Sequence, residues 1–332
     1  MSEKSVNKTN FRNVDATFYQ YDPTFGFWGI PNVEMDFSFK LRPNVYIHCR
    51  HNAKGNRDKT FEAEKIKNPI LCLGGSHSWG VGVEQELRYS DVLEKMTGTP
   101  VLNLGHCSLG LDQICLVILK KADYYKPSII IVEQYPWAIH RILSPYVIGY
   151  TRPYFYLDSR GNLKLQKVPT LSRFKVCRRI VGSFYTYQKE FKEFQAGIDL
   201  KEDYDPWTDP IFLYWKVPYY DYMYNLTDKI LSVMQDFCRR KGIRLLFGLG
   251  AIMQQFGQKR PSALVDYDLP RKRLIASIEK NGITFVDTTA PMLAAHTAKD
   301  PVIFPDGHMN EKGHRIFACE VAKILEKRKW MN

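Results

Sequence analysis

The sequence predicts an α/β protein built as a three-layer α/β/α sandwich around a mainly parallel sheet. Three observations predict this class. Apolar runs of strand length alternate five times with segments of helical periodicity. The run at 128–132, SIIIV, is continuously apolar after its first residue, as in a strand covered on both faces. Glycines stand between predicted helices and the strands that follow them, where a left-handed residue ends a helix.

The first half of the predicted core contains three strands and two helices. Gly98 and Pro100 end the first helix, and Pro127 separates the second helix from the third strand. In order, the elements are a strand at 70–73, a helix at 85–96, a strand at 101–104, a helix at about 111–124 and a strand at 128–132.

The second half of the core repeats the pattern. Leu226, Ile230 and Phe237 recur at helical spacing, and Gly242 is a plausible terminator of their helix. A good N-cap residue, Asn310, precedes the last helix. The remaining elements are a strand at 243–247, a helix at 271–280, a strand at 283–286 and a helix from about 310 to about 329.

Two segments lie outside this alternation. Residues 1–68 predict an N-terminal extension that packs on a core domain formed by 69–144 and 225–332. Residues 145–224 are rich in aromatic side chains, among them Trp207 and Trp215, and form an insertion. The insertion either has a small aromatic core of its own or is a lid whose rings stack on a substrate.

Composition and charge restrict the partners. The formal net charge of +12 would suit an anionic glycan, a membrane surface or a nucleic acid. Lysines and arginines are spread along the chain, however, and neither zinc-finger spacing nor an aromatic-basic RNA motif is found, so nucleic acid is not expected. The sequence leaves the oligomeric state open.

The cysteines and the N-terminus indicate the compartment. Seven widely spaced cysteines, several inside apolar patterns, predict reduced buried thiols rather than disulfides or a metal site. The N-terminus has no apolar leader-like region, and no run approaches the length of a transmembrane helix. The expectation is a cytoplasmic protein without a membrane span, metal or organic cofactor.

A candidate nucleophile follows the first core strand in the segment LGGSHSWGVGV. Ser76 comes directly after two glycines, at the carboxyl end of the strand, where open α/β sheets bind ligands. Its backbone N–H can point at a developing oxyanion. On this segment alone, a plain strand-to-helix turn with a capping serine is an equally good interpretation.

Two further segments supply what a serine nucleophile needs. In NLGHCSLG, Gly105 could offer a second backbone N–H to the oxyanion. In FPDGHMNEKGH, Asp306 and His308 are two residues apart, which in extended backbone places both side chains on one face. A histidine oriented by a carboxylate is the general base that an unactivated serine requires.

Together these segments resemble three of the sequence blocks of the SGNH (GDSL) hydrolase superfamily: the nucleophile block, the second block and the final block. The resemblance covers about residues 19–141 and 226–328, and implies a flavodoxin-like α/β sandwich with serine esterase activity. By this resemblance Ser76 is the nucleophile, Asp306 the orienting acid and His308 the base, and the N–H groups of Ser76 and Gly105 form the oxyanion hole. The Asp-x-His spacing resembles the branch that acts on polysaccharide acyl esters.

The chain departs from the family pattern in two places. Gly75 replaces the usual aspartate before the nucleophile. The Gly-x-Asn-Asp block is missing after 128–132, where the chain reads EQYPWAIHR, so Gln134 is the nearest amide that could replace the family's third oxyanion donor. Close by lies a structural or substrate-facing group of side chains: Glu133, Trp137, His140 and Arg141. Candidate substrate-binding residues are Gly75, His77 and Trp137.

The sequence therefore predicts a serine-dependent esterase acting on an O-acyl ester, with the O-acetyl group of a carbohydrate or related small ester as the favoured substrate. Two alternatives remain. A sugar hydroxyl could resolve the acyl-enzyme, which would make the protein a glycan O-acyltransferase. The missing block also permits a non-catalytic protein of SGNH fold that binds glycan or a protein partner.

Overall fold

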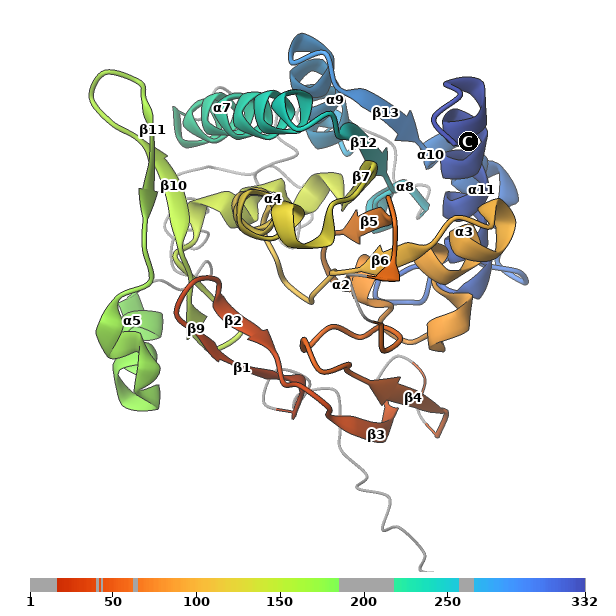
Figure 1. The fold of residues 1–332 in the computed structure, drawn as a ribbon, viewed down its shortest axis with the longest axis horizontal. Coiled ribbons are helices and arrows are strands. Elements are labelled where there is room, and N and C mark those ends of the chain that lie inside the picture. The colour runs from red at the N-terminus through yellow and green to blue at the C-terminus, as the bar shows by residue number, and fades with distance from the viewer. Residues whose placement is uncertain are drawn as a thin grey trace, which may run out of the picture.

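The core of the protein is a five-stranded parallel sheet with helices on both faces, which confirms the predicted α/β fold class (Figure 1). The structure is a computed structural model and describes residues 17–39, 42, 44–61, 65–184, 218–256 and 266–331. The strands lie in the order β13-β12-β7-β5-β6, which is the flavodoxin-like order. This order changes direction between β5 and β7, so the switch point at which such sheets bind ligands lies between these two strands.

The sheet strands are β5 Ile70–Leu73, β6 Val101–Asn103, β7 Ile129–Gln134, β12 Arg244–Leu249 and β13 Thr284–Asp287. The helices around them are α2 Ser76–Trp79, α3 Tyr89–Thr97, α4 Leu111–Tyr125, α7 Pro218–Arg240, α8 Met253–Phe256, α9 Leu269–Lys280, α10 Thr289–Ala295 and α11 Glu311–Lys327. Two 3-10 helices, η3 Gln85–Leu87 and η4 Pro136–Leu143, complete this part of the chain.

Successive residues of β7 point to opposite faces of the sheet and into two hydrophobic clusters. Ile130 belongs to a cluster that includes α4 and α7, whereas Ile129 and Ile131 belong to a cluster that includes α3 and α11. Both faces of the strand are therefore buried, which explains why its sequence is continuously apolar rather than alternating. Figure 1 shows the two groups of helices on either side of the sheet.

Among the elements whose boundaries differ from the prediction are β7, the helix predicted at 85–96, and α7. β7 continues to Gln134, two residues beyond the prediction, and thereby carries Glu133 and Gln134 to the edge of the sheet. The helix predicted at 85–96 is split into η3 and α3 because Arg88 between them is extended, with its buried guanidinium paired to Asp91 at 2.8 Å. Helix α7 begins at Pro218, so residues 218–224 of the predicted insertion lie on this helix.

The described part of the N-terminal extension contains two antiparallel strand pairs, β1 Tyr19–Asp22 with β2 Gly26–Gly29 and β3 Glu34–Ser38 with β4 Tyr46–Arg50. Phe18 packs edge-on against Trp79 of α2, with 5.3 Å between ring centroids. The buried guanidinium of Arg57 donates to the carbonyl oxygens of Gly80 and Val83, at 2.5 and 2.8 Å. The extension thus supports the loop that follows Ser76.

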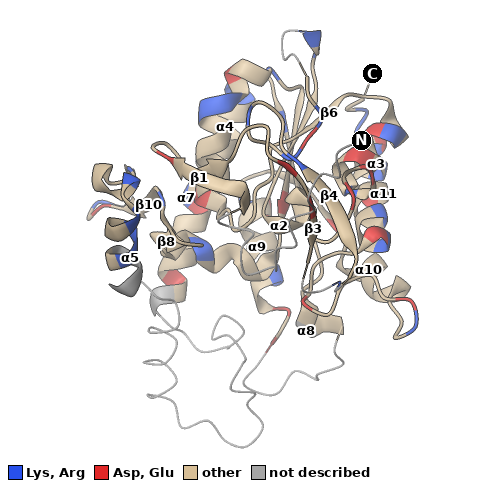
Figure 2. Ribbon diagram, turned by 90° about the horizontal axis from the view of Figure 1, so that it is seen from below, with Lys and Arg blue, Asp and Glu red and all other residues tan. Residues whose placement is uncertain are grey.

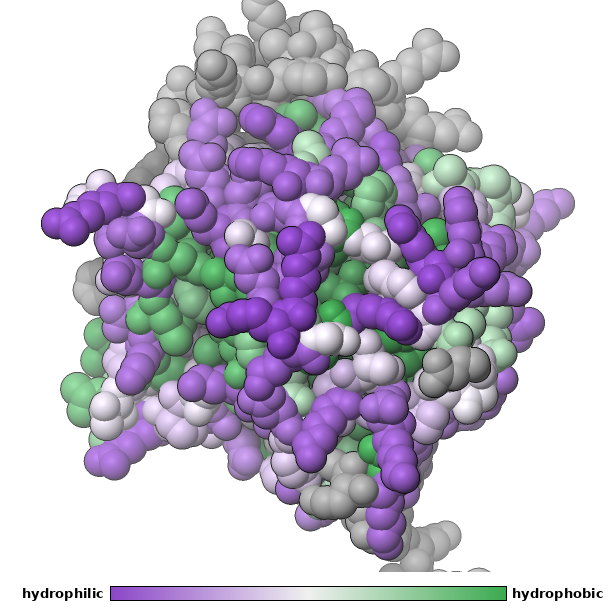
Figure 3. All heavy atoms as spheres, turned by 45° about the horizontal axis from the view of Figure 1, so that its top comes forward, coloured by the Kyte–Doolittle hydropathy of each residue, from purple (hydrophilic) through white to green (hydrophobic). Residues whose placement is uncertain are grey.

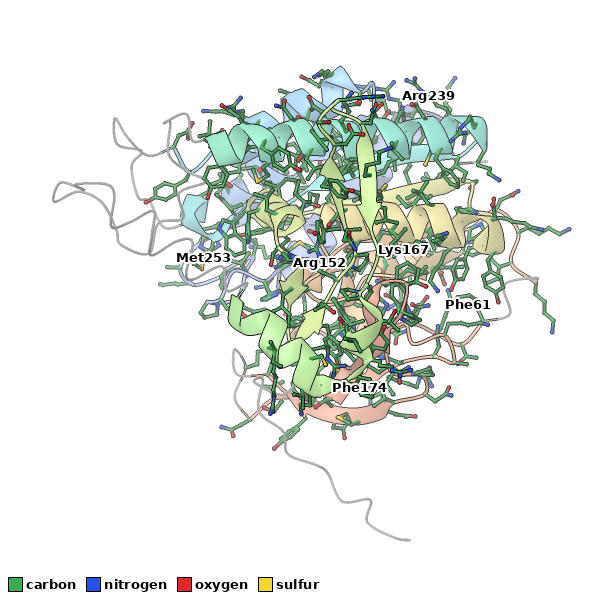
Figure 4. The ribbon with its side chains drawn as sticks, turned by 90° about the vertical axis from the view of Figure 1, so that its left-hand side faces the viewer. Phe61, Arg152, Lys167, Phe174, Arg239 and Met253 are labelled. Atoms are coloured by element: carbon green, nitrogen blue, oxygen red, sulfur yellow. The ribbon has the colours of Figure 1, made fainter. Side chains whose placement is uncertain are left out.

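The insertion is described in part. It contains the strands β8 Tyr146–Val147, β9 Tyr150–Thr151, β10 Tyr154–Leu157 and β11 Leu163–Gln166, the 3-10 helix η5 Thr170–Arg173 and the helix α5 Lys175–Phe184. The β10–β11 hairpin and α5 lie toward the viewer in Figure 4, where Phe174 and Lys167 are labelled. Trp207 and Trp215 lie outside the described residues, so the proposed lid stays a prediction.

All seven cysteines are described and are free thiols, five of them buried, as the sequence predicts. In the described ranges no helix is long and apolar enough to cross a membrane. Basic and acidic residues are interspersed along most of the ribbon in Figure 2. Hydrophilic side chains likewise dominate the face shown in Figure 3, with smaller apolar areas between them.

Candidate active site

Ser76 is the first residue of α2, directly after β5 and the two glycines. Its Oγ lies 2.8 Å from Nε2 of His308, and Nδ1 of His308 lies 2.9 Å from Oδ2 of Asp306. The structure therefore brings together the three residues that the sequence proposes as a triad, from segments 232 positions apart. Both distances are within hydrogen-bond reach, and the chain of contacts runs from hydroxyl to imidazole to carboxylate.

A tight turn, rather than the extended backbone that we expected, places Asp306 and His308 side by side. The N–H of Phe304 donates to the carbonyl of His308 at 2.7 Å, and Gly307 between the pair has φ of 90°. Glycine suits this left-handed conformation because it has no Cβ. The N–H of His308 also donates to Oδ1 of Asp306 at 3.1 Å, so both carboxylate oxygens hold the same residue.

The carboxylate fixes the state of the imidazole. Burial raises the pKa of Asp306, but the hydrogen bonds and charge of His308 outweigh it and leave this pKa below its usual value. Asp306 is therefore ionised at neutral pH and accepts a hydrogen bond from Nδ1–H of His308, which leaves the lone pair of Nε2 facing Ser76. This tautomer can receive the hydroxyl proton.

Glu133, at the end of β7, holds the short helix that carries Ser76. Its buried carboxylate accepts from Oγ of Ser78 at 3.2 Å and from the backbone N–H groups of Gly75 and Ser78. A Cβ on Gly74 would collide with Ser78 Oγ and would lie 2.7 Å from Glu133 Oε2. Gly74 is thus required by the carboxylate that caps α2, and Glu133 fixes the position of α2.

A matched pair of glycine variants tests this packing. We expect Gly74→Ala to destabilise the protein by about 1–3 kcal/mol, the usual cost of overpacking. Gly75→Ala should change the free energy of unfolding much less, because a Cβ there finds its nearest neighbour, Arg141 Nη1, at 3.4 Å. Thermal or denaturant unfolding of both variants measures the difference, and equal stabilities would contradict the assigned packing.

A second prediction concerns the titration of Glu133. Burial raises its pKa from 4.5 to about 7, against the opposing hydrogen bond of Ser78 and charge of Arg141. A carboxyl that holds its proton more tightly when folded makes the folded state lose stability as pH rises from about 4.5 to about 7. Glu133→Gln removes that loss, so its stability relative to wild type should increase from about pH 5 to about pH 8, by at most about 3 kcal/mol. Melting curves that stay parallel for the two proteins over this pH range would contradict the prediction.

Ser76 and His308 open on a small cavity of about 100 Å³ at the sheet's switch point, between the chain segments that follow β5 and β7. Ligand pockets for larger molecules span about 300–1,000 Å³, so the cavity suits a small group. The lining residues are Gly75, Ser76, His77, Leu109, Ile114, Glu133, Gln134, Tyr135, Trp137, Ala138, Arg141, Asp306, Gly307 and His308.

The candidate substrate-binding residues Gly75, His77 and Trp137 all line this cavity. The ring of His77 lies between Tyr135, on which it stacks at 5.0 Å, and His308 at 5.1 Å. Burial and the nearby positive groups lower the pKa of His77 well below its usual value, so the ring is neutral. The neutral ring of His77 therefore packs against the ring of His308 without placing a charge beside it.

The structure does not place Gly105 at the cavity. Its N–H donates to Oδ1 of Asn103 at 2.8 Å, and the residue is buried against α2, where a Cβ would collide with Ser78. The glycine is required by packing rather than by a reacting carbonyl, so the geometry gives no support to its predicted role as an oxyanion donor. Gln134 does line the cavity, but its Nε2 donates to the carbonyl of Tyr135 at 3.0 Å.

Several lining residues were missed or left unassigned by sequence reasoning. Leu109 and Ile114, after β6, form an apolar part of the wall, and Tyr135 lines the cavity directly after the end of β7. Of the unassigned residues, Arg141 came nearest to being assigned, because sequence analysis grouped it with the side chains after the strand at 128–132, where a Gly-x-Asn-Asp segment is missing. The common signal is position: each follows the carboxyl end of a core strand, where all such loops meet.

The fold and site define an α/β protein with a hydrogen-bonded serine, histidine and aspartate at the switch point of its sheet. No family model and no curated protein sequence matches the chain. Among solved structures it is similar to a lipolytic protein of the G-D-S-L family from Desulfitobacterium hafniense, at 10% identity and a TM-score of 0.40 over 78% of this chain and 100% of that chain.

Two further solved structures are similar at the same level. They are the psychrotrophic esterase EstA from Pseudoalteromonas sp. (11% identity, TM-score 0.43, 79% of this chain and 99% of that chain) and a lipase/acylhydrolase from Enterococcus faecalis (10% identity, TM-score 0.43, 78% and 96%). Likenesses this weak carry no argument about activity, so the function must be inferred from the site itself.

Proposed function

We propose that this protein is a serine-dependent ester hydrolase of SGNH type, with Ser76 as nucleophile, His308 as general base and Asp306 as the residue that orients it. One observation carries the proposal: the continuous hydrogen-bonded path from Ser76 through His308 to Asp306, at 2.8 and 2.9 Å, at the mouth of a small cavity. A structural serine or a solvated Asp-x-His loop would not require this alignment.

In the first half-reaction, Oγ of Ser76 attacks the carbonyl carbon of the ester while Nε2 of His308 takes the hydroxyl proton. The electron pair of the carbonyl bond moves to oxygen and gives a tetrahedral oxyanion. When the carbon–oxygen bond to the alcohol breaks, that pair returns, and His308 gives its proton to the leaving alcohol. Asp306 stabilises the imidazolium that exists between these two steps.

In the second half-reaction a water molecule replaces the alcohol. His308 takes a proton from the water as its oxygen attacks the acyl carbon, and a second tetrahedral oxyanion forms, with a hydroxyl group in place of the departed alcohol. Collapse breaks the bond to Oγ, which recovers a proton from His308, and the carboxylic acid leaves. The described triad therefore supplies every proton transfer of ester hydrolysis.

The cavity favours a short acyl group. Its volume of about 100 Å³ and the apolar side chains of Leu109, Ile114 and Ala138 fit an acetyl group better than a long chain. Trp137 at the same site is an aromatic residue of the kind that packs on sugars. We accordingly propose an O-acetyl ester of a carbohydrate or related small alcohol as the substrate.

The test uses wild-type protein and p-nitrophenyl esters of increasing chain length. We expect turnover of the acetate, with kcat/KM falling as the acyl chain lengthens, and covalent labelling by a fluorophosphonate that reacts with activated serines. Absence of both turnover and label would overturn the proposal in favour of a non-catalytic binding protein. Product analysis with and without an acetyl-accepting oligosaccharide separates hydrolysis from transfer.

A further inference from the structure

Arg141 lines the cavity but has no role in the mechanism proposed for Ser76, His308 and Asp306. It lies on η4, the 3-10 helix that follows β7, and lines the same cavity as Ser76 and His308. Its Nη1 donates a long hydrogen bond, 3.4 Å, to the carbonyl of Leu109 in the segment between β6 and α4. The guanidinium therefore reaches from the segment after β7 to the segment after β6, while Ser76 follows β5, the strand between them.

The guanidinium lies directly beside the backbone that precedes the nucleophile. A Cβ built on Gly75 would be 3.4 Å from Arg141 Nη1, and outside the adjoining residues no other atom would lie within 4 Å of it. The lack of a side chain at Gly75 leaves this approach open. Any side chain at position 75 would begin in van der Waals contact with the guanidinium.

No carboxylate of the described residues forms a salt bridge with the guanidinium of Arg141. Within the described part of the chain, Arg141 forms no ion pair, and its hydrogen bond to Leu109 uses one of the five N–H donors of an arginine. Glu133, the carboxylate beside it in the cavity lining, accepts instead from Ser78 and from α2. By contrast, the buried Arg152, labelled in Figure 4, is paired with Asp112.

We propose that Arg141 is a catalytic residue whose guanidinium donates hydrogen bonds to the tetrahedral oxyanion formed on Ser76. This inference rests on the proposed esterase function. The site needs such a donor, because Gly105 N–H is engaged by Asn103 and the Gly-x-Asn-Asp segment is missing. As the Oγ–carbon bond forms, the carbonyl electron pair moves to oxygen, and the N–H···O bonds strengthen without transfer of a proton from Arg141.

The test compares Arg141→Ala and Arg141→Lys with wild type on p-nitrophenyl acetate. Loss of one oxyanion donor typically lowers kcat by about 10²–10³, so Arg141→Ala should lose that much with KM changed only a few-fold. Arg141→Lys keeps the charge but not the planar fork and should recover only part of the loss. Guanidinium ion added to Arg141→Ala, below the concentration that lowers its Tm, should restore part of kcat.

Arg240→Ala is the matched control, because it removes the same charge from an exposed position at the end of α7 and should leave kcat unchanged. A raised KM with unchanged kcat in Arg141→Ala would overturn the proposal and show instead that the guanidinium binds an anionic group of the ground-state substrate. A loss of kcat that guanidinium does not rescue, together with a lowered Tm, would show a structural role. Failure of wild type itself to turn over or take label would refute the esterase proposal, which is a separate outcome.

Discussion

Ser76→Ala should lower kcat for p-nitrophenyl acetate by about 10⁶ and abolish labelling by fluorophosphonate. Removal of the serine of a serine-protease triad has an effect of this size, because the remaining groups then have no nucleophile to activate. The fold should survive, since Ser76 Oγ makes its described hydrogen bond to His308 alone. Steady-state kinetics, gel-based labelling and thermal unfolding of the purified variant measure the three quantities.

Ser78→Ala is the matched control for this experiment, because it removes a second hydroxyl from the same short helix. Ser78 Oγ contacts the carbonyl of Leu73, the hydroxyl of Tyr89 and the carboxylate of Glu133 rather than His308. This variant should keep the fluorophosphonate label while losing stability, since these buried groups lose a hydrogen-bond partner. Label that persists in Ser76→Ala and disappears in Ser78→Ala would show that Ser78 is the nucleophile and would contradict the assignment to Ser76.

His308→Ala should lower kcat nearly as much as Ser76→Ala, by about 10⁶, because the serine hydroxyl then has no proton acceptor. Asp306→Asn should lower kcat by about 10⁴, since an amide favours the wrong tautomer of the imidazole. The same kinetic assay at a range of pH values measures both. His48→Ala, at an exposed position on β4, should leave kcat unchanged.

The losses of kcat caused by Ser76→Ala and by His308→Ala should not add when the two substitutions are combined. Residues that act as one unit lose their joint contribution when either is removed, so the double variant Ser76→Ala/His308→Ala should be no slower than Ser76→Ala. A further loss in the double variant would mean that His308 contributes to the residual activity through another group. His77, which packs on the His308 ring at 5.1 Å, would be the first to examine.

Several features could be predicted from the sequence because they depend on local pattern. Continuous apolar runs fixed the positions of the core strands to within one or two residues at most ends, as β5 and β6 illustrate. Asn310 caps α11 as predicted, with its Oδ1 accepting from Gly313 N–H at 3.0 Å. The segment carrying Ser76 was a candidate because a serine follows a buried strand and two glycines, and the segments of Gly105, Asp306 and His308 then favoured the nucleophile over a plain turn.

Other features depend on contacts between distant segments, and no local pattern records them. Glycine is required at both Gly74 and Gly105, but only the structure shows that Ser78 of α2 occupies the space where each Cβ would lie. The short spacing of Asp306 and His308 suggested an extended strand, whereas the hydrogen bonds of a closed turn align them. The direction of an N–H or of a side chain is set by such partners.

The sequence by itself determined the α/β class, the chain order of the strands and the residue types able to form a triad. It did so because hydrophobic periodicity and glycine positions act over a few residues. Only the tertiary structure decided which donors remain available at the cavity: Gly105 N–H is engaged by Asn103, while Arg141, 65 positions beyond Ser76 in the chain, lines the same cavity. Whether a donor is free to bind a substrate depends on whether folding has already given it an acceptor, and the segments that meet at the cavity are far apart in the sequence.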